Sequence, residues 1–223
     1  MVDIIFLTLP RLELRAPITA PAILKATVED KGHKAYCYDL NLDLWLNVDT
    51  KKHGAVWFDT DLTFRYEDKF EEFWNEIIHE HSLRWIDHIK TKNPKWIGMT
   101  IFSQRSKWIS IKLCKILKEN FPDVKLVAGG PFAEYTGKLL YDKGLVDCYV
   151  VGEGEEAILN ILENKFDVPG VNGNAPVQIN DLDTIPIPDY SDFHMDKYPT
   201  TWSDPRIKDD SQMGTDFVYI TGS

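Results

Sequence analysis

Five short apolar segments alternate with helical patterns along most of this 223-residue chain. These segments span residues 2–9, 33–40, 96–102, 124–128 and 146–151. Near-continuous apolar runs are typical of strands that are buried on both faces of a parallel sheet. The helical patterns between them provide right-handed crossovers. The alternation therefore predicts an α/β fold with a doubly wound, five-stranded parallel sheet, flavodoxin-like or Rossmann-like, in the order 2-1-3-4-5.

Two regions interrupt this rhythm. Residues 41–95 form a long insertion after the second strand, rich in tryptophan and phenylalanine, and the periodicity of residues 66–90 predicts one long or broken helix. From about residue 166, prolines recur too often for a helix, which predicts an irregular, proline-rich linker over residues 166–215. We therefore expect an α/β domain over residues 1–165, and residues 216–223 resemble the first strand of another domain.

Charge and composition exclude several functional classes. The formal net charge is −10, with 35 acidic and 25 basic residues, which argues against a broad nucleic-acid surface. No apolar run approaches the ~18–20 residues that span a bilayer. The acidic Asp3 near the start does not fit a signal peptide, so we expect a cytoplasmic location without a membrane partner. Three widely spaced cysteines fit neither a disulfide framework nor a zinc site, and we expect them to be reduced and buried.

The ends of the third, fourth and fifth strands carry the candidate binding residues. Gly129, Gly130 and Pro131 form a turn at which a ligand could approach the backbone, although a plain tight turn explains them as well. Ser103 could contact a ligand or cap the following helix. Residues 152–157 match the dinucleotide pattern G-x-G-x-x-A, but three glutamates stand where a phosphate would bind, which favours a capped helix start. Neither the histidines nor the carboxylates show the spacing of a metal site or an acid/base pair, so we assign no catalytic and no metal-binding residue.

Taken in order, several motifs resemble the N-terminal cobalamin-binding domain of B12-binding radical SAM proteins. A proline-containing loop follows the first strand, K-G-H precedes the second, and the second ends in D-L-N. The later motifs are I-G-M-T-I-F-S (residues 97–103), A-G-G-P-F-A (128–133), D-C-Y-V-V-G-E-G-E (147–155) and L-D-T-I-P-I-P-D-Y (182–190). The resemblance covers nearly the whole chain.

The resemblance implies a site for cobalamin across the carboxyl ends of the strands. The nucleotide tail would enter beside the third and fourth strands, near Ser103, Gly129, Gly130 and Pro131. The turn formed by Gly152, Glu153, Gly154 and Glu155 would border the same crevice. The loop that contains Thr8, Leu9 and Pro10 would lie below the corrin ring. Two alternatives remain open: a flavodoxin-like protein that binds a nucleotide or flavin, and a degenerate, cofactor-free scaffold that binds partners through residues 41–95.

Two departures from the family pattern refine the expectation. The loop after the first strand contains no D-x-H-x-x-G histidine, so cobalamin would be base-off without a histidine ligand from the protein. The cluster motif C-x-x-x-C-x-x-C is also absent, so we expect a chain truncated before a radical SAM domain, which would act in cis or in trans. S-adenosylmethionine and a [4Fe–4S] cluster would belong to the full-length protein alone. That protein would be an enzyme, for example a methyltransferase or a cyclase, whereas this chain would not catalyse a reaction by itself.

Overall fold

The structure, a computed structural model, describes residues 1–58 and 61–199. A parallel sheet of five strands has the order β2-β1-β3-β4-β5, which confirms the predicted topology. The strands are β1 (Val2–Thr8), β2 (Ala35–Asp39), β3 (Pro94–Thr100), β4 (Lys125–Gly129) and β5 (Cys148–Tyr149). The strand predicted at residues 216–221 and the end of the predicted linker lie outside the described residues.

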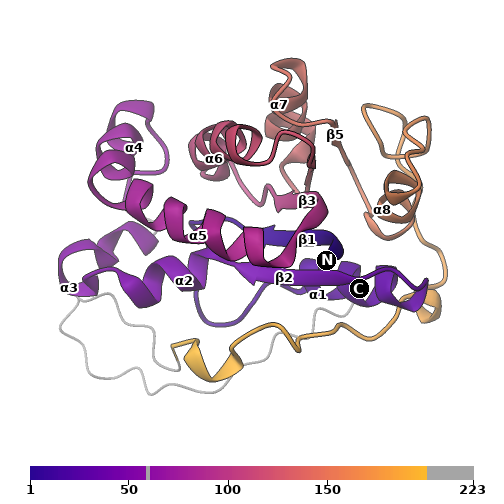
Figure 1. Ribbon diagram of the computed structural model, residues 1–223, viewed down its shortest axis with the longest axis horizontal. Coiled ribbons are helices and arrows are strands. Elements are labelled where there is room, and N and C mark those ends of the chain that lie inside the picture. The colour runs from indigo at the N-terminus through magenta and orange to yellow at the C-terminus, as the bar shows by residue number, and fades with distance from the viewer. Residues whose placement is uncertain (59–60, 200–223) are drawn as a thin grey trace.

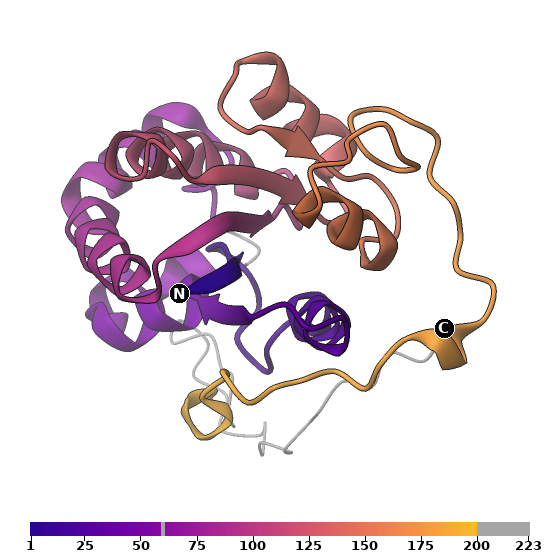
Figure 2. The same ribbon diagram turned by 45° about the vertical axis from the view of Figure 1, so that its right-hand side comes forward.

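The sheet lies between two layers of helices (Figures 1 and 2). The helices α1 (Thr19–Asp30) and α8 (Glu155–Leu162) cover one face, and α5 (His79–Lys92), α6 (Ser106–Asn120) and α7 (Lys138–Asp142) cover the other. Side chains along β1 alternate between the two layers, with Ile4 and Phe6 toward α1 and α8, and Ile5 and Leu7 toward α5 and α6. Because both faces are buried, β1 is apolar at nearly every position.

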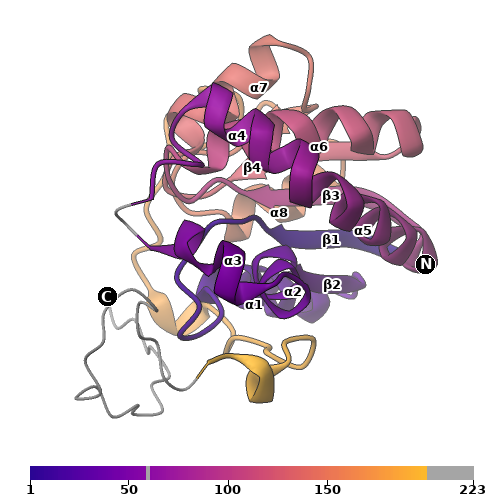
Figure 3. The same cartoon turned by 90° about the vertical axis from the view of Figure 1, so that its left-hand side faces the viewer.

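The segment between β2 and β3 is helical, as predicted. It contains α2 (Leu40–Asn47), α3 (Thr50–His53), the 3₁₀ turn η1 (Gly54–Trp57), α4 (Glu67–Phe73), the π-helical turn η2 (Trp74–Ile78) and α5. Of the predicted alternatives, a long or a broken helix, the structure shows the long one: residues 67–92 are continuously helical, and the π-helical turn η2 joins α4 to α5. Both α4 and α5 pack against α6 (Figure 3). The helix α5 is also the crossover from β2 to β3, and it buries Trp85, Ile86 and Ile89 in the core.

The fifth strand is shorter than the predicted segment 146–151. Val150 still donates its N–H to the carbonyl of Ala128 on β4 at 2.8 Å, and it forms an antiparallel bridge with Val171. The backbone N–H of Val151 donates to the carbonyl of Gly170 at 2.8 Å. The chain after α8 thus returns to cover this edge of the sheet. Its backbone pairs with outward-facing N–H and C=O groups of residues 149–151, which would otherwise be unpaired at the sheet edge.

Beyond α8 the described chain has no regular element longer than the 3₁₀ turns η4 (Leu182–Thr184) and η5 (Met195–Lys197). This irregular segment passes along α1 and the edge strand β2 (yellow in Figure 1). Phe193 and Tyr198 are each 7% exposed, so it packs on the domain. No helix in the described part of the chain is long and apolar enough to cross a membrane.

Candidate functional site

Two adjacent rows of residues on the α1 and α8 side of the sheet define the candidate site. Phe6, Gly98 and Val127 stand opposite one another on β1, β3 and β4. The next row toward the carboxyl ends contains Thr8, Thr100 and Gly129. Glycine occupies one position in each row, so the sheet surface is lowered there. A Cβ at Gly98 would already lie 3.1 Å from the ring of Phe6.

A crevice of about 430 Å³ opens above these rows. Its volume falls within the range that holds small organic ligands, roughly 300–1,000 Å³. Leu24 of α1 and Ile158 of α8 form side walls. The complete lining is Phe6, Ala20, Pro21, Leu24, Gly98, Met99, Thr100, Val127, Gly129, Gly130, Pro131, Glu134, Val150, Val151, Gly152, Glu153, Gly154, Glu155 and Ile158. The crevice is therefore mainly apolar, with a few polar groups where the strands end.

The predicted turn after β4 lines this crevice, and its two glycines have different roles. A Cβ at Gly129 would meet nothing within 4 Å, so any side chain there would extend into free space. Gly130 has φ +106°, and its Cβ would lie 3.0 Å from the carbonyl oxygen of Ile101. Ile101 donates to the carbonyl of Gly129 at 2.6 Å and accepts from the N–H of Phe132 at 2.9 Å. The first glycine leaves room, and the second allows a turn that is fixed to the end of β3.

The predicted turn after β5 lines the crevice as well, but it is also attached to the irregular segment. Gly152 has φ +85°, and a Cβ there would lie 2.7 Å from Pro176. The carboxylate of Glu153 accepts a hydrogen bond from the backbone N–H of Ile179. One carboxylate oxygen of Glu155 is buried without a hydrogen-bond partner. This turn therefore closes one end of the crevice, and its glutamates do not form a phosphate cradle.

The other predicted residues lie around the crevice but do not line it. Thr8 is 2% exposed, and its hydroxyl has no partner. Leu9 and Pro10 are buried beyond it. The hydroxyl of Ser103 accepts a hydrogen bond from the N–H of Arg105 at 3.2 Å, in the turn before α6. The N-cap position of α6 is Arg105, and no side chain caps it, so Ser103 does not have the predicted capping role.

A second cavity of about 330 Å³ lies at the same end of the sheet. The loop and helix start at residues 12–20 supply most of its lining, together with Phe102. Thr100 and Pro131 line both this cavity and the crevice, so the two are neighbours. The loop expected below the corrin thus faces the same end of the sheet as the crevice.

Several residues that line the crevice could not be identified as site residues from the sequence. Phe6, Leu24, Val127 and Ile158 look like ordinary core residues in the sequence, because their apolar side chains fit the buried pattern. Gly98 carried a signal, since a glycine inside a buried strand often marks the close approach of a ligand or another backbone.

No cluster of three or more His, Cys, Asp or Glu side chains that could hold a metal ion occurs in the described part of the chain. Cys37, Cys114 and Cys148 are free and buried, as predicted. Burial raises the pKa of Cys114 and of Cys148 to about 12. These thiols are packing residues.

The main feature of the site is the apolar crevice at the carboxyl ends of a doubly wound parallel sheet. A crevice in this position is typical of α/β domains that bind a cofactor.

Comparison with known families gives a match over part of the chain. Residues 77–162 match the B12-binding domain family. The matched residues run from just before α5 to the end of α8, so they include Gly98, both glycines of the turn after β4 and the turn at residues 152–155. The β1, α1 and β2 elements lie outside the match.

A curated protein and a solved structure are also similar to parts of this chain. An uncharacterized methyltransferase from Pyrococcus horikoshii is 29% identical over 126 residues, which cover 49% of this chain and 27% of the relative. The solved structure of the cobalamin-dependent S-adenosylmethionine radical enzyme OxsB, with aqua-cobalamin and S-adenosylmethionine bound, matches with a TM-score of 0.56 at 12% identity. That match covers 88% of this chain and 25% of the enzyme, and it shows a shared fold. The chain spans about a quarter of the length of these relatives.

Proposed function

We propose that this chain is the cobalamin-binding module of a radical S-adenosylmethionine enzyme, and that its crevice holds the nucleotide tail of cobalamin. The observation that carries the proposal is the floor of the crevice, where Gly98 and Gly129 leave the strands without side chains at the carboxyl end. Parallel α/β domains bind ligands at that end. The B12-binding family match gives the cofactor, and the shared fold with OxsB is consistent with it.

The chemistry of the crevice suits the nucleotide tail. The benzimidazole base is flat and largely apolar, and Phe6, Leu24 and Ile158 offer apolar contact surface. Cobalamin as a whole is much larger than 430 Å³, so the corrin ring would remain outside, over the strand ends. Thr100, which lines the crevice, and Glu134 provide polar groups near the strand ends.

We infer that bound cobalamin is base-off and has no histidine ligand from this chain. Residues 9–18, the loop after β1, contain no histidine. If the crevice holds the benzimidazole, that base cannot ligate cobalt at the same time. In the cob(II)alamin state the complex should then give an electron paramagnetic resonance spectrum without nitrogen superhyperfine splitting from an axial ligand. A resolved nitrogen triplet would contradict this part of the proposal.

The module would bind and orient the cofactor, and it would not catalyse a reaction by itself. Cobalamin supplies a cobalt centre that can carry a methyl group, while the protein positions it. The 223 residues contain no C-x-x-x-C-x-x-C motif for a [4Fe–4S] cluster. S-adenosylmethionine and the cluster would therefore come from a radical SAM domain, in cis or in trans. With cobalamin, S-adenosylmethionine and the cluster together, the complete enzyme would act as, for example, a methyltransferase or a cyclase.

The flavin or nucleotide alternative is less well supported by the residues. A phosphate-cradling loop after the first strand usually needs glycine, and residues 9–15 contain none. The cofactor-free scaffold makes a separate prediction, since it would bind neither cobalamin nor flavin mononucleotide. One binding experiment therefore distinguishes the three functions.

A Gly129→Leu variant tests the proposed site directly. The leucine side chain would occupy the crevice, and because a Cβ at this position meets nothing within 4 Å, the fold should tolerate it. Lys115→Leu is a matched control, because Lys115 is exposed on α6, on the other face of the sheet. We expect wild type and Lys115→Leu to retain hydroxocobalamin through gel filtration, as judged by the corrin absorption bands, and Gly129→Leu to lose it. Equal retention by all three proteins would refute the site.

A further inference from the structure

The irregular segment after α8 contains a strap, residues 189–198, that is docked on the outside of α1 and β2. The backbone N–H of Asp189 donates to the carbonyl of Ala22 at 3.0 Å. The backbone N–H of Cys37, on edge strand β2, donates to a carboxylate oxygen of Asp192 at 3.0 Å. At the end of β2 the hydroxyl of Tyr198 donates to the carboxylate of Asp39. The strap thus covers the edge of β2 and reaches its carboxyl end.

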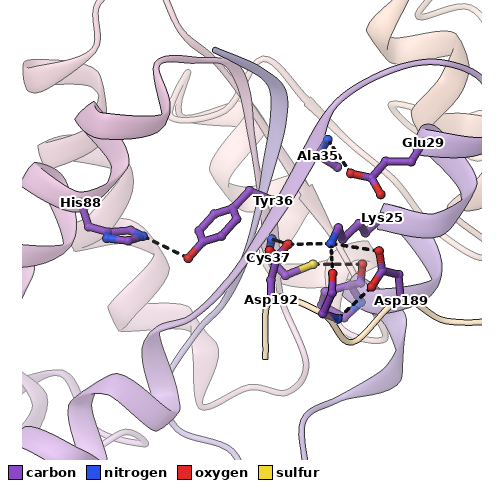
Figure 4. A network of polar contacts seen from close by, with 10 residues as sticks. Lys25, Glu29, Ala35, Tyr36, Cys37, His88, Asp189 and Asp192 are labelled. Atoms are coloured by element: carbon purple, nitrogen blue, oxygen red, sulfur yellow. Dashed lines mark hydrogen bonds and ion pairs between the residues drawn. The ribbon is translucent and has the colours of Figure 1, made fainter. Parts of the chain in front are cut away.

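Lys25 is at the centre of this contact (Figure 4). Its side chain is 6% exposed, and its ammonium group lies 3.0 Å from the carboxylates of both Asp189 and Asp192. It also donates to the hydroxyl of Ser191 at 2.6 Å. Burial alone would lower the pKa of Lys25, but its hydrogen bonds to the two carboxylates outweigh burial and raise that pKa. Removing the ammonium would leave two carboxylates close together without their shared partner.

The helix that carries Lys25 is also a wall of the crevice. Pro21 and Leu24 line the crevice, whereas Ala22 and Lys25 hold the strap. Near the start of α1 the hydroxyl groups of Thr19 and Tyr190 form another link, at 3.2 Å. Consequently α1 lies between the crevice on one side and the strap on the other. A change in the strap can reach the crevice through this one helix.

We propose that the strap is a clasp for the crevice, and that Lys25 is a positioning residue for cofactor binding although it does not line the crevice. By holding α1 in place, the clasp fixes Pro21 and Leu24 and so sets the width of the crevice. This inference rests on the proposed cobalamin function. It also gives a role to the motif at residues 182–190, because its last two residues, Asp189 and Tyr190, begin the strap.

Three variants of the full chain test the clasp. Lys25→Met removes the central charge and keeps an unbranched apolar chain, whereas Lys25→Arg keeps the charge. Lys112→Met is the matched control, because Lys112 forms a 2.6 Å ion pair with Glu71 in the other helix layer. Dissociation constants for hydroxocobalamin would be measured at a temperature at which circular dichroism shows every variant to be folded. Hydrogen exchange would report on α1 and on the strap.

If Lys25→Met leaves α1 in its binding position for roughly a tenth of the time, the dissociation constant rises about tenfold. We expect that loss, together with faster exchange in both α1 and the strap. Lys25→Arg should recover most of the affinity, and Lys112→Met should bind within about twofold of wild type. A role confined to stability would lower the unfolding temperature of Lys25→Met without changing its affinity in the folded state.

The inference is overturned if Lys25→Met accelerates exchange in the strap while its dissociation constant stays within twofold of wild type. If Lys25→Met does not fold, Asp192→Asn replaces it, because asparagine loses the charge but can still accept from the N–H of Cys37. Weaker cobalamin binding by Asp192→Asn would support the clasp. Faster exchange in the strap with an unchanged dissociation constant would overturn it. Failure of the wild-type chain to bind cobalamin would instead refute the proposed function and, with it, the effect of the clasp on affinity. The exchange data would still show whether the strap holds α1.

Discussion

Alanine at Gly130 should destabilise the domain strongly, whereas alanine at its neighbour Gly129 should not. At φ +106° Gly130 has a backbone conformation that an L-residue rarely adopts; the left-handed region costs roughly 1–2 kcal/mol. The new Cβ would also lie 3.0 Å from the carbonyl oxygen of Ile101 and 3.3 Å from its carbonyl carbon and its nitrogen. Both costs are absent at Gly129, which has no positive φ and no atom within 4 Å of a Cβ.

The crowding at Gly130 cannot be relieved easily. Ile101 is held by a 2.6 Å hydrogen bond to Gly129 and a 2.9 Å hydrogen bond from Phe132, so moving its backbone would weaken bonds worth about 1 kcal/mol each. The total cost of Gly130→Ala is therefore about 2–4 kcal/mol. Gly129→Ala should change the free energy of unfolding by less than about 1 kcal/mol, and it can stabilise by restricting the unfolded chain.

Urea unfolding followed by circular dichroism measures both free energies, and thermal unfolding gives a second reading. At about 2–4 °C per kcal/mol for a chain of this size, Gly130→Ala should lower the melting temperature by roughly 5–15 °C. Gly129→Ala should leave it nearly unchanged. Equal effects of the two substitutions, or a neutral Gly130→Ala, would show that the turn does not have the geometry described above.

Two further predictions concern titratable groups. Burial alone would raise the pKa of Asp189, but hydrogen bonds from Ser191 and Lys25 outweigh it and lower that pKa to about 2, from an ordinary value of 3.8. A depressed pKa stabilises the fold above the ordinary value and loses that effect as pH falls. With 33% of the side chain exposed, Asp189→Asn should cost about 1–2 kcal/mol of unfolding free energy at pH 6, and this difference should shrink as the pH falls through about 2 and vanish below it; a pH-independent difference would contradict this. The buried thiols, with pKa about 12 for Cys114 and Cys148, should not react with Ellman's reagent at pH 8 until urea unfolds the chain; rapid reaction of the native protein would show that they are accessible.

The fold was predictable because its signals are local and repeated. The five apolar runs within residues 1–165 each lie at a strand, and the order 2-1-3-4-5 is as expected. The main difference is β5, which is shorter than predicted because Val151 donates to the carbonyl of Gly170 and Val150 forms a bridge with Val171. That pairing joins segments about twenty residues apart, and no local pattern encodes it.

The sequence identified the residues of the candidate site only at positions where the backbone conformation requires a glycine. The glycines after β4 and β5 stand out in the sequence because a turn or a close approach needs them, and they line the crevice. The walls do not stand out, because Leu24 and Ile158 have the pattern of any core leucine or isoleucine. The clasp could not be predicted at all, since Lys25 and Asp192 are separated by more than 160 residues and the second lies in a segment without periodicity.

The most direct test is a parallel titration of the full chain with hydroxocobalamin, cobinamide and flavin mononucleotide. Cobinamide has the corrin ring but lacks the nucleotide tail. We predict one cobalamin per chain, at least tenfold weaker binding of cobinamide because the crevice holds the tail (about 1.4 kcal/mol or more), and no binding of flavin mononucleotide. Binding of the flavin, equal affinity for cobalamin and cobinamide, or binding of none of the three would contradict the account.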